Sequence, residues 1–269
     1  MPRSVVLVGC GNMGAALLQG WLERGMSAAA ITVVEPDLSQ ARVATDRSVP
    51  VVSVPTDLLS SSPDVVVLAV KPQVVDAVAP QYSRFADAGA VVLSIVAGKT
   101  IASLAAHLGA RAALVRAMPN TPAAVRRGIS VVCGNAAADE GHRAACEQLL
   151  AAVGAVLWVD DEAMMDAVTA VSGSGPAYVF LMAECLARAG VEAGLPAAMA
   201  QRLARETIAG SGELLARSGA PPELLRRNVT SPGGTTAAAL AVLMADDALQ
   251  ALLSRAVDAA ARRSRELAR

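Results

Sequence analysis

The sequence is poor in aromatic residues and in the side chains that most often carry out acid-base chemistry. Phe, Trp and Tyr occur twice each among 269 residues, although apolar residues make up 54% of the chain. The core must therefore be aliphatic, which suits parallel strands and closely packed helices. Lysine occurs only at Lys71 and Lys99, and histidine only at His107 and His142. We expect both histidines on exposed faces of helices, which leaves few candidates for a general acid.

The sequence also lacks the patterns of metal centres, disulfide frameworks and nucleic-acid binding. Its cysteines are few and widely spaced, without a CxxC pair or a nearby cluster of histidines, and they are Cys10, Cys133, Cys146 and Cys185. This spacing predicts no metal site and favours free thiols in a reducing compartment. The net charge is -1 and the basic residues are scattered, so we expect no nucleic-acid partner.

No targeting segment is predicted either. The apolar start Val5 to Val8 meets glycine at once and is too short for a signal peptide. The apolar stretch from Ala163 to Ala183 is long enough to span a membrane, but we expect the Ser172 to Pro176 segment to break it. The prediction is a cytoplasmic protein without a membrane partner.

Two domains are predicted, an α/β Rossmann-type dinucleotide-binding domain over residues 1–160 and an all-α domain over residues 161–269. In the first, short β-branched runs alternate with helical patterns, and the run Val65 to Val70 is typical of a strand buried on both faces. The expected strands are Ser4–Gly9, Ile31–Glu35, Val49–Val54, Asp64–Val70, Ala90–Val96, Ala112–Ala117, Ile129–Cys133 and Ala155–Val159. The expected helices of this domain include Met13–Arg24, Thr100–Leu108 and Glu140–Val153.

From Asp161 onward no such β-branched run appears, and alanine, leucine, glutamate and arginine dominate. We expect this half to be helical, with breaks at four clusters of Gly, Ser and Pro. The clusters are Ser172–Pro176, Gly194–Pro196, Gly219–Pro222 and Ser231–Gly234.

A glycine motif stands where a dinucleotide-binding turn requires it, between the first strand and the first helix. Gly9-Cys10-Gly11-Asn12-Met13-Gly14 fits G-x-G-x-x-G. Gly9 would make the tight turn, Gly11 would let the backbone approach a pyrophosphate, and Gly14 would let the helix pack on the sheet. The second strand ends at Glu35, whose carboxylate would bond ribose hydroxyls and repel a 2′-phosphate. That favours NADH over NADPH, although Arg42 and Arg47 follow.

Three further segments follow predicted strands, at the edge of the sheet where ligands bind in such folds. They are Ala69-Val70-Lys71-Pro72, Ala97-Gly98-Lys99, and Arg116-Ala117-Met118-Pro119-Asn120-Thr121-Pro122. We expect the first two to line the cofactor crevice, and Asn120 to bond a carboxamide or another ligand. A helix cap for Lys99 and a rigid surface turn around Asn120 are the structural alternatives.

The loop Asn228 to Thr236 holds Ser231-Pro232-Gly233-Gly234-Thr235 and precedes a helix from Ala237 to Met244. Amides at the start of that helix would face an anion such as a carboxylate or phosphate. The alternative is a plain turn with Thr235 or Thr236 as helix cap.

Reducing a carbonyl requires a proton for the developing alkoxide, and the all-α half contains neither lysine nor histidine. A protonated C=N acceptor removes this need, because hydride then neutralises an existing cation and hydrogen-bonding hydroxyls suffice. The loop ending at Thr236 offers both an anion site and hydroxyls.

These segments resemble the pyrroline-5-carboxylate reductases, which make proline by reducing a cyclic imino acid with NAD(P)H. The matching stretches, in order along the chain, are Val8–Gly14, Ala69–Pro72, Arg116–Pro122, Asp166–Tyr178 and Val229–Thr236. The resemblance implies that amides of Gly233, Gly234 and Thr235 hold the substrate carboxylate and that the Thr236 hydroxyl acts near the ring nitrogen. It further implies a pocket shaped by Glu162, Thr169, Ser172, Gly173, Ser174, Gly175, Asn228 and Ser231.

The resemblance also implies that Ala69, Lys71 and Ala97 line the cofactor, and that the chain forms a homo-oligomer of intertwined dimers whose sites are completed across the interface. Members that prefer NADPH tend to carry Ser, Asn, Arg or Lys where this chain has Glu35-Pro36-Asp37. The cofactor is therefore NADH or NADPH. Two alternatives remain at this point: a reductase of a related cyclic imine or 3-hydroxy acid, and a silent dinucleotide-binding protein.

Overall fold

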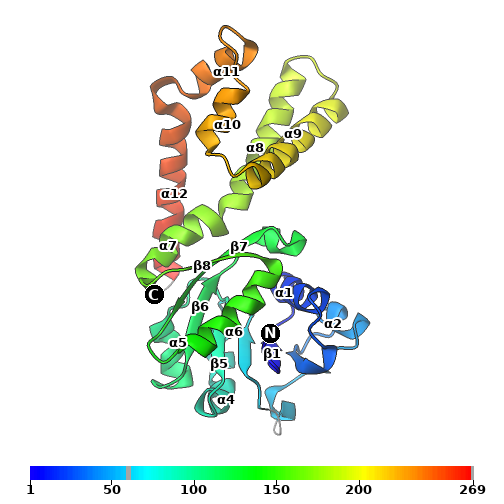
Figure 1. Ribbon diagram of the computed structural model, residues 1–269, viewed down its shortest axis with the longest axis vertical. Helices are drawn as coiled ribbons and strands as arrows, with labels where there is room; N and C mark the ends of the chain where they lie inside the picture. Colours follow the sequence, from blue (N-terminus) through cyan, green and yellow to red (C-terminus); the bar gives the residue numbers. More distant parts are fainter. Residues whose placement is uncertain (59–61, 268–269) are drawn as a thin grey trace. The chain divides into compact units, whose positions relative to one another are not determined.

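The structure is a computed structural model, and it describes residues 1–58 and 62–267. The chain divides into two compact units (Figure 1). The first unit comprises Met1–Gly173 together with the segment that begins at Ala261, and the second comprises Ser174–Ala260. The expected boundary near residue 160 lies shortly before this division, and the return of the last segment to the first unit was not expected.

The first unit is built on one eight-stranded sheet in the order β3-β2-β1-β4-β5-β6-β7-β8. All neighbouring strands are parallel except β6 and β7, which are antiparallel. The strands are β1 (Val5–Val8), β2 (Ile31–Val34), β3 (Val51–Val52), β4 (Val65–Leu68), β5 (Val91–Ser94), β6 (Leu114–Met118), β7 (Gly128–Gly134) and β8 (Gly154–Trp158). The order of the first five strands is that of a Rossmann dinucleotide-binding fold.

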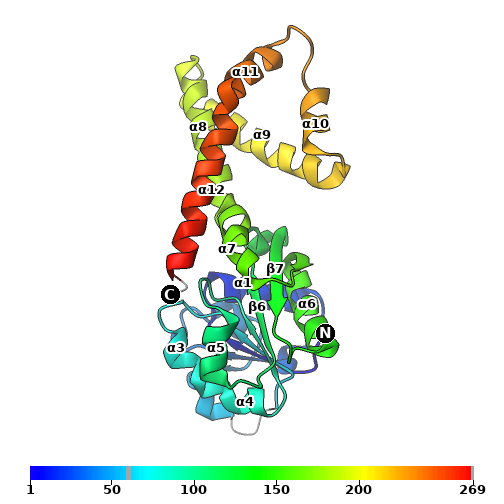
Figure 2. The ribbon, with the colours of Figure 1, turned by 90° about the vertical axis from the view of Figure 1, so that its left-hand side faces the viewer.

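Helices cover both faces of this sheet, as Figure 2 shows for α5 and α6. Alternate residues of the central strands enter two separate cores: Val65 and Val67 pack in one, and Val66 and Leu68 in the other. The valine-rich run is buried because each of its faces has a helical layer, as predicted. The helices are α1 (Asn12–Glu23), α2 (Arg42–Asp46), α3 (Val75–Val78), α4 (Ser83–Asp87), α5 (Ile101–Leu108), α6 (Glu140–Leu150) and α7 (Met165–Val168).

All eight expected strands are present, but one is much shorter than predicted. The expected strand Val49–Val54 is reduced to the two residues of β3. This strand lies at the edge of the sheet and pairs only with β2. Pro50 and Pro55 bracket it, and proline has no N–H to donate to a sheet.

The second unit is entirely helical. Its helices are α8 (Gly175–Glu192), α9 (Ala197–Ser218), α10 (Pro222–Asn228), α11 (Thr235–Leu243) and α12 (Ala248–Leu267), of which the last turns belong to the first unit. Helices α8 and α9 pack closely where Gly190 faces Ala200. A Cβ on Gly190 would lie 3.2 Å from Cβ of Ala200. Three of the four expected breaks separate these helices as predicted.

The fourth expected break, at Ser172 to Pro176, was wrong. Residues Thr169–Gly173 form a π-helical turn, so α7 continues through this turn into α8 as one long helical segment with an irregularity at Ser174. A π-turn absorbs one extra residue without ending a helix, and such turns are frequent at functional sites. Among the described residues, the segment Glu162–Glu192 is long and apolar enough to cross a membrane by length and composition alone, and a second candidate is the bent pair Thr235–Leu243 and Ala245–Leu267.

Candidate active site

The glycine-rich turn joins β1 to α1 in a shape that only glycine permits at two positions. Gly9 has φ +91°, and a Cβ there would lie 2.8 Å from the carbonyl oxygen of Ala69. A Cβ on Gly14 would collide with the carbonyl oxygen of Gly9. Gly11 differs, because its φ of -65° suits any residue and the nearest atom to its Cβ would be Oε1 of Gln40 at 3.7 Å. Among the described residues, no atom lies close enough to require glycine at position 11, so the backbone is open there to the close approach of a ligand.

A cavity of about 540 Å³ opens beside this turn at the carboxyl ends of β1, β2 and β4. Several expected cofactor-binding residues line it: Gly9, Gly11, Glu35, Ala69, Val70 and Lys71. Other expected residues flank the turn or the neighbouring strand ends: Asn12, Met13 and Gly14 in α1, Pro72 after Lys71, and Ala97 and Gly98 after β5. The structure thus brings the β1, β2 and β4 strand ends together around one cavity, as the motif predicted.

Glu35 is fixed in the wall of this cavity by backbone amides. The amide of Cys10 donates to its Oε2 at 2.9 Å, and the amide of Asp37 donates to its Oε1 at 3.0 Å. The residue is only 7% exposed. Glu35 therefore secures the glycine-rich turn from the second strand, a role that we did not predict, while it still lines the space where a ribose would lie.

Two titratable groups near Glu35 have shifted pKa values, the thiol of Cys10 and the carboxyl group of Asp37. Burial, and secondarily the charge of Glu35, raise the pKa of the Cys10 thiol to about 11. Hydrogen bonds from Ser39 and Gln40 lower the pKa of Asp37, which is exposed. Two carboxyl groups, those of Glu35 and Asp37, stand together at the end of β2.

The two lysines differ in their surroundings. Lys71 is exposed and lines the cavity. Lys99 instead pairs with Asp76, whose Oδ2 lies 2.7 Å from Nζ, and His107 approaches the same carboxylate at 3.3 Å. Lys71 therefore lies at the cavity, whereas Lys99 takes part in a surface ion pair.

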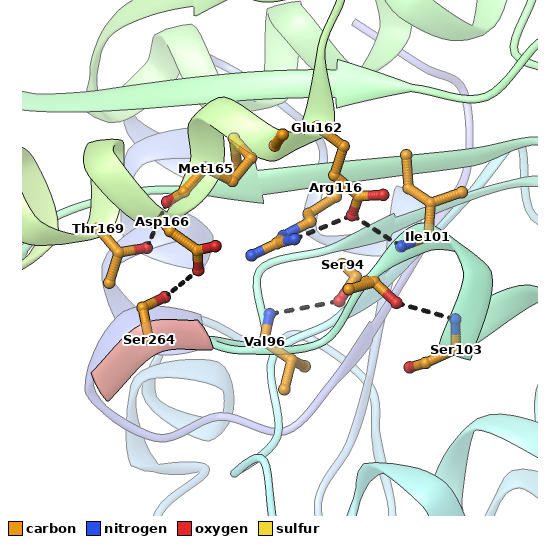
Figure 3. Close-up of polar contacts among 12 residues, drawn as sticks. Ser94, Val96, Ile101, Ser103, Arg116, Glu162, Met165, Asp166, Thr169 and Ser264 are labelled. Carbon is orange, nitrogen blue, oxygen red and sulfur yellow. Dashed lines mark hydrogen bonds and ion pairs between the residues drawn. The ribbon is translucent and has the colours of Figure 1, made fainter. Parts of the chain in front are cut away.

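A nearly buried ion pair joins β6 to the segment that precedes α7 (Figure 3). Nη1 of Arg116 donates to Oε1 of Glu162 at 2.9 Å, and the same oxygen accepts the Ile101 amide at 2.8 Å. The Arg116 side chain is 5% exposed. Glu162 was expected at the edge of a substrate pocket, but its carboxylate is engaged here in holding the start of α5.

Residues expected at the cofactor and substrate sites also meet at the π-turn. Nδ2 of Asn120 lies 3.3 Å from Oγ of Ser172, and its Oδ1 accepts the Ile129 amide at 2.9 Å. The side chain of Met118 packs where a Cβ of Gly173 would be. These contacts occupy the amide of Asn120, which we had expected to bond a ligand.

Elsewhere on that helical segment, the hydroxyl of Thr169 donates to the carbonyl oxygen of Met165 within its own helix at 2.8 Å. Ser174 and Gly175 follow the π-turn at the start of α8.

The loop between α10 and α11 follows the last residue of α10, Asn228, and contains a tight turn. Pro232 is its second residue, Gly233 has φ +71°, and the amide of Gly234 donates to the carbonyl oxygen of Ser231 at 3.1 Å. This pattern is typical of a type II turn. The Gly234 amide, which we expected to face a carboxylate, is therefore used within the turn.

The amides that follow the turn are open. Gly234 caps α11 without any side-chain cap, so neither Thr235 nor Thr236 serves as the cap. In the described part of the chain, the amides of Thr235, Thr236 and Ala237 donate to no acceptor, as is usual for the first turn of a helix. Three N–H groups and the positive end of α11 are available for an anion.

The contacts of three polar residues were not predicted from the sequence. Arg116 lies between Val115 and Ala117 in an apolar strand, and an arginine in such a position signals a buried partner. Asp166 and Ser264 hydrogen-bond each other across 98 positions of sequence. No local pattern reveals a partner at that separation.

Comparisons with known proteins agree with this geometry. Residues 162–267 match the family model described as pyrroline-5-carboxylate reductase dimerisation, and residues 4–98 match the one described as NADP oxidoreductase coenzyme F420-dependent. A pyrroline-5-carboxylate reductase of Pseudomonas aeruginosa is 42% identical over 99% of this chain and 97% of its own length. The chain belongs to the pyrroline-5-carboxylate reductase family. One of Arabidopsis thaliana is 38% identical over 98% of this chain and 95% of its own length.

Solved structures of this family share the fold. A pyrroline-5-carboxylate reductase from Coxiella burnetii superimposes with a TM-score of 0.93 at 32% identity, with 99% of each chain covered. A Plasmodium falciparum pyrroline carboxylate reductase with NADP bound superimposes with a TM-score of 0.84 at 29% identity, with 99% of this chain and 98% of that chain covered. The predicted fold class, a Rossmann-type domain followed by a helical dimerisation domain, is confirmed.

Family membership explains the exposed apolar surface of the second unit. Large apolar side chains such as Phe180, Leu203 and Val242 are 63%, 51% and 73% exposed in the single chain. Exposed surface of this kind marks a protein–protein contact. The match to the dimerisation model supports homo-oligomerisation of the chain through this region.

Proposed function

We propose that this protein reduces 1-pyrroline-5-carboxylate to L-proline with NADH or NADPH, the last step of proline biosynthesis. The observation that carries the proposal is the 42% identity to a pyrroline-5-carboxylate reductase over 99% of the chain. The glycine-rich turn with its cavity and the open helix start at α11 supply the two sites that such a reaction needs.

The dinucleotide would supply a hydride to C5 of the ring. Gly9, Gly11 and the start of α1 would hold its pyrophosphate, and the cavity lined by Glu35 and Lys71 would take the adenosine half. The segments Ala97–Gly98 and Met118–Asn120 follow β5 and β6. We assign them to the nicotinamide half because they lie beyond β4 in the sheet, on the opposite side of the turn from β2.

The imino acid would be held by its carboxylate at the start of α11. The amides of Gly233, Thr235 and Thr236 are not used within the described chain and offer charge-assisted hydrogen bonds. The ring nitrogen is already protonated, so the hydroxyl oxygen of Thr236 needs only to accept a hydrogen bond from its N–H and not to supply the proton. Thr169 and the segment Ser172–Gly175 are proposed as the rest of the pocket.

We further propose that residues 161–269 form the substrate-binding and dimerisation domain, that intertwined dimers complete the sites, and that the enzyme acts in the cytoplasm. The segment Glu162–Glu192 is apolar on surfaces that a second subunit would cover. An aliphatic helix face buried between subunits needs no membrane.

The assay is oxidation of NADH or NADPH, followed at 340 nm, with and without 1-pyrroline-5-carboxylate. We expect oxidation only when the imino acid is present, with proline as the product. A panel containing a six-membered cyclic imine and a 3-oxo acid tests the related reductase activities. No oxidation with either cofactor, or faster turnover of another panel member, would refute the assignment.

Thr236→Val tests the role of the hydroxyl. Loss of one positioned hydrogen-bonding group should lower kcat by roughly 10- to 1000-fold. Thr45→Val is the matched control, because the Thr45 hydroxyl donates to a backbone carbonyl on the exposed helix α2, and its kcat should equal that of the wild type. An unchanged rate in Thr236→Val would remove this residue from the mechanism.

A further inference from the structure

The loop between β5 and α5 lies at the ligand-binding edge of the sheet and is held by residues from distant parts of the chain. It follows the carboxyl end of β5, the neighbour of β4, and runs to the cap of α5 at Thr100. Gly98 within it has φ +74°. In folds of this kind such loops contact the cofactor, and this inference rests on the proposed function in that respect.

The last turn of α12 packs directly on this loop. A Cβ on Gly98 would lie 3.3 Å from Cβ of Leu267 and 3.4 Å from its carbonyl oxygen. The space beside Gly98 is thus bounded by the last turn of the helix. A displacement of this turn of α12 would remove the surface against which Gly98 rests.

A hydrogen bond fixes the same turn of α12. The hydroxyl of Ser264 donates to Oδ1 of Asp166 in α7 at 2.6 Å (Figure 3), and Ser264 is only 5% exposed. Ser264 and Leu267 are three positions apart and therefore share a face of the helix. A short bond to a carboxylate is among the stronger hydrogen bonds of a protein.

Asp166 is itself anchored near the other end of the loop. It lies four residues after Glu162, whose carboxylate accepts the amide of Ile101, the first residue of α5. The pair Arg116–Glu162 fixes that carboxylate from β6. One short segment, from Glu162 to Asp166, thus holds both the end of the loop and the helix that covers Gly98.

We propose that Ser264 is a positioning residue for cofactor binding: its hydrogen bond to Asp166 holds the last turn of α12 against Gly98 and so keeps the β5–α5 loop in its dinucleotide-binding shape. Ser264 acts through Leu267 and Gly98, and does not itself touch cofactor or substrate. The C-terminal helix thereby contributes to the affinity for the dinucleotide.

The test is dinucleotide binding without imino acid, measured by fluorescence titration with NADH and NADPH, together with KM and kcat. In Ser264→Ala the dissociation constant and the KM for the dinucleotide should rise about 10-fold. This rise corresponds to losing part of the stabilisation that one hydrogen bond to a carboxylate provides. The kcat at saturating dinucleotide and the KM for the imino acid should stay within about twofold. Leu267→Gly removes the Cβ that faces Gly98 and should raise the same constant without removing the hydrogen bond. Asp166→Asn, which keeps an oxygen acceptor, should restore most of the affinity relative to Asp166→Ala.

Ser254→Ala is the matched control, because Ser254 lies on the same helix and accepts only an exposed bond from Gln250. Its dissociation constant should be that of the wild type. An unchanged dissociation constant in both Ser264→Ala and Leu267→Gly would overturn the proposal. Equal rises in the KM for dinucleotide and the KM for imino acid, in proportion to the loss of melting temperature, would also overturn it. If the wild type binds dinucleotide but reduces no imine, the proposed function is refuted, and the role of Ser264 is still decided by the same binding test. If the wild type binds no dinucleotide, both the proposed function and the role of Ser264 are overturned.

Discussion

Replacement of Gly11 by alanine should separate binding of the cofactor from stability of the fold. Gly11 lines the cavity beside the glycine-rich turn, and its backbone has φ -65° and ψ -169°. Alanine adopts this conformation without strain. The added methyl group would meet only Oε1 of Gln40, at 3.7 Å, which is an ordinary van der Waals distance.

The magnitude follows from these contacts. In the free protein, Gly→Ala at a compatible conformation stabilises by about 0.4 to 1 kcal/mol through the unfolded chain. In the complex, the methyl group would occupy space that a pyrophosphate needs, and overpacking costs about 1 to 3 kcal/mol. The dissociation constant for the dinucleotide should therefore rise roughly 10- to 100-fold.

The assay combines thermal unfolding with titration of NADH and NADPH. Gly11→Ala should melt at or slightly above the wild-type temperature and bind dinucleotide weakly. Gly14→Ala serves as the contrast, because its Cβ would collide with the backbone carbonyl of Gly9. That variant should lose both stability, by several degrees, and binding.

Two results would contradict this reasoning. Wild-type affinity in Gly11→Ala would mean that the dinucleotide does not approach the turn at this residue. A melting temperature as low as that of Gly14→Ala would mean that glycine is needed at position 11 by the fold itself.

Two further predictions concern the surroundings of Glu35. The carboxylate of Glu35 should make the wild type prefer NADH. Glu35→Ser should shift the ratio of the KM values for NADH and NADPH toward NADPH by about 10-fold, or 1.4 kcal/mol. An unchanged ratio, or a wild type that strongly prefers NADPH, would show that Glu35 does not select the cofactor. Because the pKa of Cys10 is raised to about 11, its thiol stays protonated at pH 8 and becomes reactive only as the pH approaches that value. Iodoacetamide at pH 8 should therefore leave Cys10 unmodified by mass spectrometry, and rapid alkylation there with loss of activity would show that the thiol is accessible and ionised.

The parts of the fold that could be predicted from the sequence are those with a local physical signature. The run Val65–Leu68 is a strand because β-branched residues pack well in a sheet that is covered on both sides. The turn at Gly9 and the breaks between α8, α9, α10 and α11 follow from glycine and proline, which act on the backbone at their own position.

The parts that could not be predicted depend on distant partners. Strand β7 pairs antiparallel with β6. The direction of this pairing depends on how the two strands meet in the sheet, and neither strand's own sequence reveals it. The Ser172 region looked like a helix break because its composition favours turns, yet packing of Met118 on Gly173 accompanies a π-turn instead. The partners of Arg116 and Glu35 lie 46 and 25 positions away, so the engagement of these charges was visible only in three dimensions.

The Rossmann unit is discontinuous in sequence, because the segment from Ala261 completes a unit that otherwise ends at Gly173. Domains generally fold in the order of their synthesis. Here the sheet can form early, but the helical turn that covers Gly98 is synthesised only after the whole of the second unit. The dinucleotide site should therefore reach its final form late in synthesis, after the surfaces that bring subunits together already exist. Newly made chains would meet one another before their dinucleotide site has its full affinity.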